Sequence, residues 1–145
     1  MPTALDMLST KGSKIHWIEP HATVLAATHR MNQHKLGALV VKQNGRIVGM
    51  FTERDVLTRV VGGQRDPSTT TVAEVMSSDV ICVHPTTDID DIGAIMRERR
   101  IRHLPVADQD GELLGMISIG DLNAFHSSNQ EAHIHFLSEY IYGRA

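Results

Sequence analysis

The pattern of apolar and polar positions runs twice along this chain, and each copy predicts the same elements. A short β segment is expected at residues 14–18 and again at 80–83, each ending just before a proline. A helix then begins near Thr23 and near Asp88, because both residue types are favourable N-caps. Helical spacing predicts its apolar face, formed by Val24, Ala27 and Met31 in the first copy and by Ile89, Ile92 and Met96 in the second.

The rest of each copy predicts a hairpin and a second helix. Asn44-Gly45 and Asp110-Gly111 are hairpin signals, because both central residues of a type I′ turn need positive φ. The second helix is expected to open at Thr52 and at Ser118. The predicted strands on either side of the turns are 36–42, 46–51, 102–107 and 112–117.

The two copies also correspond residue by residue, which marks an internal repeat. Pro20 corresponds to Pro85, and after one extra residue in the second copy Gly49 corresponds to Gly115. Each copy reads as β-α-β-β-α, and a unit of roughly 40–60 residues is marginal alone, so the two units should pack together. The predicted boundaries are 1–62 for the first repeat with its N-terminal segment, 63–70 for a linker, 71–126 for the second repeat and 127–145 for a C-terminal helix.

Two shorter signals lie outside the repeats. Thr71-Val72-Ala73-Glu74 has the form of a capping box and predicts a short helix that ends near Met76. The tail carries apolar residues at helical spacing, with Gly143 as a C-terminal cap, and we expect that face to pack on the module or on a partner chain. Its apolar residues are Phe136, Leu137, Tyr140 and Ile141.

Composition narrows the class of protein. The chain has 145 residues, of which 41% are hydrophobic, and a formal net charge of -3, which argues against a large nucleic-acid footprint. It has no apolar run of the roughly 20 residues that span a bilayer, and its first residues lack the apolar segment of a signal peptide. We therefore expect a cytoplasmic protein. The single cysteine, Cys82, stands in an apolar stretch and is interpreted as a small buried hydrophobe.

The repeated feature with chemical content is a strand that ends in a hydroxyl residue, with an aspartate three positions later. Thr52 is followed by Asp55, and Ser118 by Asp121. One interpretation is an ordinary capping box. The other is a ribose-phosphate site, because a helix N-terminus favours phosphate and a carboxylate can accept from both vicinal hydroxyls of a ribose. Capping boxes favour the longer Glu or Gln at this position, yet both copies have Asp. The aspartates therefore favour the ribose-phosphate interpretation.

The sequence resembles a tandem pair of CBS domains, the Bateman module. The resemblance spans residues 20–56 and 85–122 and rests on the prolines, the Gly turns, the Thr/Ser-x-x-Asp helix starts and the strands around Leu39 and Leu104. It implies an α/β fold of the α+β type, in which two β-α-β-β-α repeats pack through their sheets with pseudo-twofold symmetry. It also implies two clefts that bind AMP, ADP, ATP, NAD or S-adenosylmethionine, and association into homodimers.

The resemblance also implies which residues line the clefts. Asp55 and Asp121 would hold the ribose, with Thr52 and Ser118 at the phosphate or ribose. The segments before the first strands would contact adenine through Gly12, Ser13, Ser77 and Ser78. The starts of the middle strands would line the clefts with Leu36, Gly37, Ala38, Ile101, Arg102 and His103.

The two copies differ at charged positions. Arg54 corresponds to Gly120, and Arg102 corresponds to Gly37. Arg54 is a further candidate for phosphate contact, because a guanidinium makes charge-assisted bonds to phosphate, and Arg102 is either a ligand contact or a surface arginine. We therefore expect two unequal clefts.

Other classes of site find little support. His133 and His135 are the close histidine pair, with no cysteine or acid at ligand spacing, so no metal site is predicted. No nucleophile with a base and no phosphate-binding glycine loop appears, so we expect no catalysis. Two functions stay open: a stand-alone nucleotide sensor that signals to a partner in trans, or a constitutive homodimeric scaffold with empty clefts.

Overall fold

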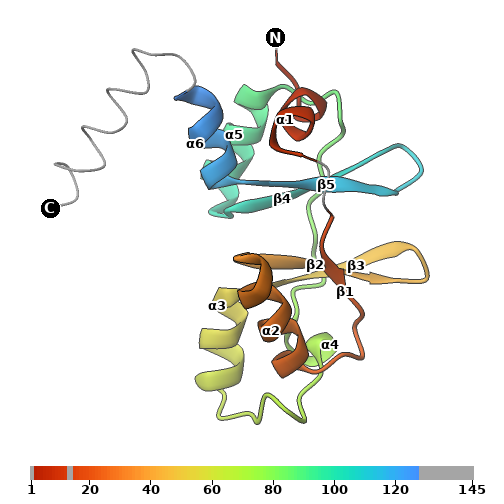
Figure 1. Ribbon diagram of the computed structural model, residues 1–145, viewed down its shortest axis with the longest axis vertical. Coiled ribbons are helices and arrows are strands. Elements are labelled where there is room, and N and C mark those ends of the chain that lie inside the picture. The colour runs from red at the N-terminus through yellow and green to blue at the C-terminus, as the bar shows by residue number, and fades with distance from the viewer. Residues whose placement is uncertain (1, 13–14, 128–145) are drawn as a thin grey trace, which may run out of the picture.

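The computed structural model describes residues 2–12 and 15–127. Ser13 lies outside the described residues, as does the predicted C-terminal helix beyond residue 127 with its two histidines. Within the described part, strands and helices form two units stacked with their sheets facing each other and their helices outward (Figure 1). The expectation of an α+β fold built from two repeats is confirmed.

The first unit is a three-stranded sheet covered by helices. Strand β1 runs parallel to β2, and β2 pairs antiparallel with β3. Thr23 caps α2 by accepting a hydrogen bond from the Ala26 N–H at 3.1 Å, as its residue type predicts. The elements are β1 (Trp17–Ile18), α2 (Val24–His34), β2 (Ala38–Gln43), β3 (Arg46–Thr52), α3 (Glu53–Asp55) and the π-helical segment η1 (Val56–Val61).

The second unit repeats this order around a two-stranded sheet. Its elements are α5 (Ile89–Arg99), β4 (His103–Ala107), β5 (Leu113–Ser118) and α6 (Ile119–His126). The predicted apolar faces of α2 and α5 are buried in both units, from Val24 to Met31 and from Ile89 to Met96. Amphipathic spacing therefore located both helices correctly.

The prediction of a strand at residues 80–83 is wrong. Only Val83 pairs with the sheet, in a parallel bridge to Val106. Pro105 occupies the position that Val40 holds in the first unit, where Val40 pairs with Trp17. Proline has no N–H, so it cannot donate to the residues before Val83, and the ladder stops after one pair. Cys82 is exposed, so its interpretation as a buried hydrophobe is also wrong.

The two hairpin turns differ. Asn44 and Gly45 both have positive φ, 54° and 77°, as a type I′ turn requires. In the second hairpin only Gly111 has positive φ, so the type I′ prediction is wrong there. The extra residue makes this loop longer, and the Asp108 carboxylate organises it by accepting from the N–H groups of Asp110 and Glu112 at 2.9 and 3.0 Å.

The two sheets pack face to face through a shared apolar layer. Ala38 and Val40 of β2 and Met50 of β3 are buried against Leu113 of β5. Ile47, Val80 and Met116 add to this layer at its margins. The predicted packing of the units through their sheets is thus observed, and it places the starts of β2 and β4 at one junction.

Short helices are exchanged between the units. Helix α1 (Ala4–Lys11) precedes the first unit in the chain but packs on the second, where Ala4, Met7 and Leu8 are buried. Helix α4 (Val72–Val75) precedes the second unit but packs on the first through Val72 and Val75, and it has the predicted capping box and ends before Met76. Figure 1 shows α1 beside α5 and α6, and α4 beside α2. The predicted boundaries assign α1 to the first repeat and α4 to the second, whereas each of these helices packs on the other unit.

Candidate ligand-binding site

The two helix starts singled out in the sequence have the same local geometry. The Ser118 N–H donates to Asp121 Oδ2 at 2.8 Å, and the Asp121 N–H donates to Ser118 Oγ at 3.1 Å. Thr52 and Asp55 exchange the corresponding bonds at 2.9 and 3.3 Å. Both pairs are therefore complete capping boxes, so aspartate serves this structural purpose here as well as the longer acids do.

Asp121 has a further partner that the sequence did not indicate. Lys11, in the last turn of α1, places its Nζ 2.7 Å from Asp121 Oδ2 and 2.7 Å from the Met116 carbonyl oxygen. Partial burial by itself would raise the pKa of Asp121, but the hydrogen bonds from Lys11 and from the Ser118 N–H outweigh it and hold that pKa below its ordinary value. The carboxylate is thus ionised and paired at neutral pH.

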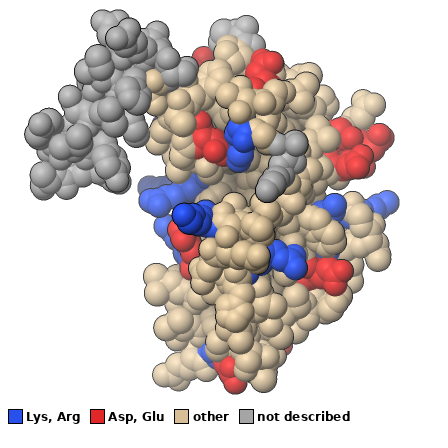
Figure 2. All heavy atoms as spheres, viewed as in Figure 1, with Lys and Arg blue, Asp and Glu red and all other residues tan. Residues whose placement is uncertain are grey.

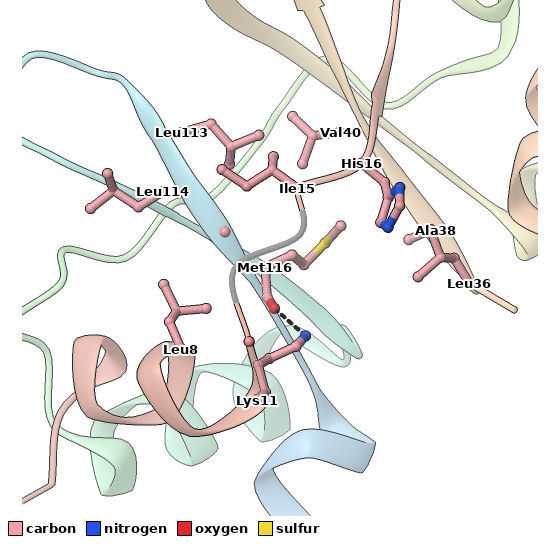
Figure 3. A pocket seen from close by; sticks show the side chains of 12 residues that line it. Leu8, Lys11, Ile15, His16, Leu36, Ala38, Val40, Leu113, Leu114 and Met116 are labelled. Carbon is pink, nitrogen blue, oxygen red and sulfur yellow. Dashed lines mark hydrogen bonds between the residues drawn. The ribbon is translucent and has the colours of Figure 1, made fainter. Parts of the chain in front are cut away.

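A cleft opens between the two sheets next to this ion pair (Figure 3), and we call it the Asp121 cleft, although Lys11 is the member of the pair that lines it. It brings together three of the predicted residues, Gly12, Leu36 and Ala38, and encloses about 450 Å³ when open solvent is included. The enclosed cavity is only about 50 Å³, against the roughly 300 Å³ or more usual for a ligand pocket. The lining residues that sequence reasoning missed are Leu8, Lys11, Ile15, His16, Val40, Leu113, Leu114, Gly115 and Met116.

The sequence contains one signal that could have placed Lys11 beside the cleft. Thr3 and Asp6 form a capping box at the start of α1, as Thr71 and Glu74 do at the start of α4. The shared motif marks α1 as the counterpart of α4, and therefore as part of the repeat. A residue at the end of α1 then lies where the chain enters the first strand, beside the cleft.

The starts of the two middle strands meet at the junction. A Cβ on Gly37 would lie 3.4 Å from the His103 ring and 3.5 Å from a carboxylate oxygen of Glu53, so the histidine packs over the start of β2. Burial lowers the pKa of His103, although the nearby carboxylates of Glu53 and Asp121 oppose that effect. The backbone oxygens of Gly37 and Arg102 each accept the first N–H of their own unit's second helix, while the Arg102 side chain is exposed. Ile101 packs against the core of the second unit.

The Asp55 side is built differently. Asp55 is only 6% exposed, and Arg59 Nε lies 3.8 Å from its Oδ1. Ser77 exchanges two backbone hydrogen bonds with Met50 at 2.8 and 2.9 Å, so the chain after α4 continues the edge of β3. Ser78 and Arg54 are exposed. The two sides of the junction therefore differ. Lys11 pairs with Asp121 on one side, and the segment at Ser77 is hydrogen-bonded to β3 on the side of Asp55.

Other kinds of site find little support within the described residues. No group of three or more histidine, cysteine or acidic residues there is arranged to hold a metal ion. None of the helices in residues 2–12 and 15–127 is both long and apolar enough to cross a membrane.

The repeat is matched by a known family. The protein-family model described as "CBS domain" matches residues 7–62 and 72–126 of this sequence, which together make up most of the chain. The chain belongs to the CBS domain family. Its two matches correspond to the two units of the fold, so the chain contains a pair of CBS domains.

Individual relatives agree with this assignment. The CBS domain-containing protein YhcV of Bacillus subtilis is 34% identical over 132 residues, which cover 91% of each chain. A putative signal-transduction protein with CBS domains from Burkholderia ambifaria has a similar structure, with a TM-score of 0.84, 36% identity and coverage of 89% of this chain and 96% of that one.

Other solved CBS structures carry ligands or form assemblies. PAE2072 from Pyrobaculum aerophilum, complexed with AMP, matches with a TM-score of 0.71 at 26% identity, covering 83% of this chain and 89% of that one. Hypoxic Response Protein I with two coordinated zinc ions has a TM-score of 0.72 at 27% identity, with coverage of 86% and 99%. A hexameric CBS-CP12 protein from cyanobacteria has a TM-score of 0.73 at 29% identity, with coverage of 84% and 69%.

Proposed function

We propose that this CBS pair is a regulatory module that binds an adenine nucleotide in the Asp121 cleft and performs no catalysis. The observation that carries the proposal is the position of that cleft. It lies between the two units, lined by Met116 of β5 and the start of β2, and Lys11 connects it to Asp121 in the first turn of α6. CBS domains commonly serve regulation, and a relative of the same fold has AMP bound.

Each part of a nucleotide has a suitable partner here. The apolar side chains of Leu36, Ala38 and Met116 offer a surface for the adenine ring. Asp121 has one carboxylate oxygen in its capping bond and a second for ribose hydroxyls. The N-terminus of the eight-residue helix α6 and the Ser118 hydroxyl favour a phosphate beside them.

Binding must change the local structure, and this gives the module a means of signalling. The cleft offers only about 50 Å³, so we propose that lining side chains such as Ile15, His16 and Met116 shift when a nucleotide enters. These residues belong to both units, and their movement alters how the units meet. A ligand shifts such an equilibrium only by its differential affinity for the two arrangements. We propose that a partner protein reads this change in trans.

The alternative function is a constitutive scaffold whose clefts stay empty. It is favoured by the capping boxes, which explain Asp55 and Asp121 without any ligand. In both cases we propose that the chain forms a homodimer, while the hexameric CBS-CP12 relative makes larger assemblies a second outcome. Light scattering with and without nucleotide distinguishes these states.

Calorimetric titration separates the two functions. Wild-type protein is titrated with AMP, ATP, NAD and S-adenosylmethionine, and we expect binding of at least one phosphate-bearing ligand below millimolar concentration. Asp121→Asn keeps an oxygen for the Ser118 N–H but removes the carboxylate, so it should abolish binding in that cleft. Asp55→Asn is the matched control and should spare it. Failure of all four ligands to bind at millimolar concentration would favour the scaffold.

A further inference from the structure

Lys11 stands at the entrance of the Asp121 cleft and pairs with its acid. We propose that Lys11 makes this cleft selective for phosphorylated adenosine over uncharged adenosine and over cationic ligands such as S-adenosylmethionine. The inference rests on the proposed function, because it names which ligand charge the same cleft accepts.

The fold fixes Lys11 in this place. It is the last residue of α1, and α1 is anchored on the second unit by Met7 and Leu8, which are 2% and 9% exposed. Figure 3 shows its side chain directed toward the Met116 carbonyl oxygen at the edge of the cleft. An ammonium has three N–H donors, and the bonds to Met116 and Asp121 use two of them. One donor remains for a ligand in the cleft that Lys11 lines.

The two aspartates receive their positive partners from different elements. Asp55 is paired within its own unit by Arg59, four residues on, whose Nε lies 3.8 Å from Asp55 Oδ1. Asp121 is instead paired by Lys11 of the exchanged helix α1, and this lysine also lines the cleft. Figure 2 shows basic and acidic side chains interspersed along the junction of the two units.

The ion pair sets a different cost for each kind of ligand. Lys11 and the Ser118 N–H both bind Asp121 Oδ2, so a ribose can use Oδ1, but uncharged adenosine offers the third donor of Lys11 no anionic partner. A phosphate gives the ammonium an oxyanion partner through a charge-assisted hydrogen bond, so AMP gains a contact that adenosine lacks. A sulfonium ligand brings a second positive charge next to the Lys11 ammonium, and the two repel each other.

The test compares AMP, adenosine and S-adenosylmethionine on four proteins by calorimetry. Wild type should prefer AMP to adenosine. Lys11→Met keeps the apolar stem and removes the charge, and the ratio of AMP to adenosine affinity should fall about tenfold or more, the size of one charge-assisted contact. Lys11→Arg should keep the preference. Lys42→Met is the matched control, because Lys42 lies over the Trp17 ring at 4.9 Å and does not line this cleft.

The outcomes are distinct. An unchanged ratio in Lys11→Met, even with a lower melting temperature, would give Lys11 a structural role and overturn the inference alone. Absence of binding of AMP and adenosine to wild type would overturn the inference, and only failure of ATP, NAD and S-adenosylmethionine as well would overturn the proposed function. If Lys11→Met does not fold, the salt dependence of wild type decides, since the preference for AMP should weaken as ionic strength rises.

Discussion

Met76 lies directly over Gly49, so close that a Cβ on this glycine would stand 2.5 Å from the Met76 sulfur. The second unit repeats the relationship, with Leu8 over Gly115. Met76 follows α4 and Leu8 belongs to α1, so each repeated glycine makes room for the helix exchanged onto its unit. The glycines that mark the repeat in the sequence are therefore explained by close packing of the exchanged helices.

Gly49→Ala should destabilise the protein by about 1–3 kcal/mol, the usual cost of overpacking a filled core. The new methyl would also stand 2.9 Å from the Ser77 backbone oxygen, which cannot move as a side-chain end can. Urea unfolding measures the change. Gly120→Ala is the control, because its Cβ would meet only Ser118 Oγ at 3.6 Å. Equal stability of Gly49→Ala and wild type would show that α4 packs elsewhere.

Gly115→Ala should cost less than Gly49→Ala. Its nearest neighbours are all atoms of the Leu8 side chain, at 2.8 to 3.5 Å, and a leucine can change rotamer. Combining it with Leu8→Ala should cost less than the sum of the two single changes, because the smaller side chain removes the clash. Strict additivity in this double-mutant cycle would contradict the contact.

The exchange of α1 predicts where a core mutation in the N-terminal segment acts. Met7→Ala should cost about 2–5 kcal/mol, as for other buried large-to-small changes. The amides of β4 and β5 should lose protection from hydrogen exchange more than those of β2 and β3, because Met7 is buried in the second unit. Leu5→Ala, in the same helix but 52% exposed, is the control. Loss of protection mainly in β2 and β3 would refute the exchange.

Local signals predicted most of the elements, and non-local contacts account for the rest. The N-cap Thr23, the apolar face of α2 and the Asn44-Gly45 turn depend on neighbours a few residues away, so they can be read from the chain. No strand forms at residues 80–83 because Pro105 of β4, more than twenty residues away in the chain, has no N–H to donate to this segment. The Lys11–Asp121 pair joins the two ends of the described chain and depends on the exchange of α1. Of the candidate site, Gly12, Leu36 and Ala38 were predicted to line the cleft, but most of its apolar lining was not.

The two hairpin loops should respond differently to alanine. Asn44 has φ of 54°, and Asn44→Ala should cost about 1–2 kcal/mol, because alanine lacks the short polar side chain that lets asparagine tolerate the left-handed region. Asp110, in the longer second loop, is not among the residues with positive φ, so Asp110→Ala should be near neutral. Thermal unfolding of both variants makes the comparison, and similar losses in the two would contradict the different turn types.

His103 should make stability depend on pH below neutrality. Burial holds its folded-state pKa below the ordinary value of 6.5, so the unfolded chain binds a proton at higher pH than the folded one. The free energy of unfolding should therefore fall as pH decreases through about 6.5, and should stop falling on this account once the folded-state pKa is passed. The groups that face the ring set the size of the effect: the carboxylates of Glu53 and Asp121 raise the pKa, and Lys11 and Arg102 lower it.

His103→Gln removes this titration, so urea unfolding of the variant should show a weaker fall in stability between pH 7 and pH 5 than wild type does. His126→Gln, an exposed position in α6, is the matched control for the loss of one imidazole and should follow the wild-type curve. Titration of Asp121 does not mask the effect. The pKa of Asp121 is held below its ordinary value of 3.8, so protonation of this carboxylate lowers the free energy of unfolding only at more acidic pH. Parallel pH curves for wild type and His103→Gln would mean that the imidazole is solvated at the junction, which would contradict the packing of His103 against Gly37.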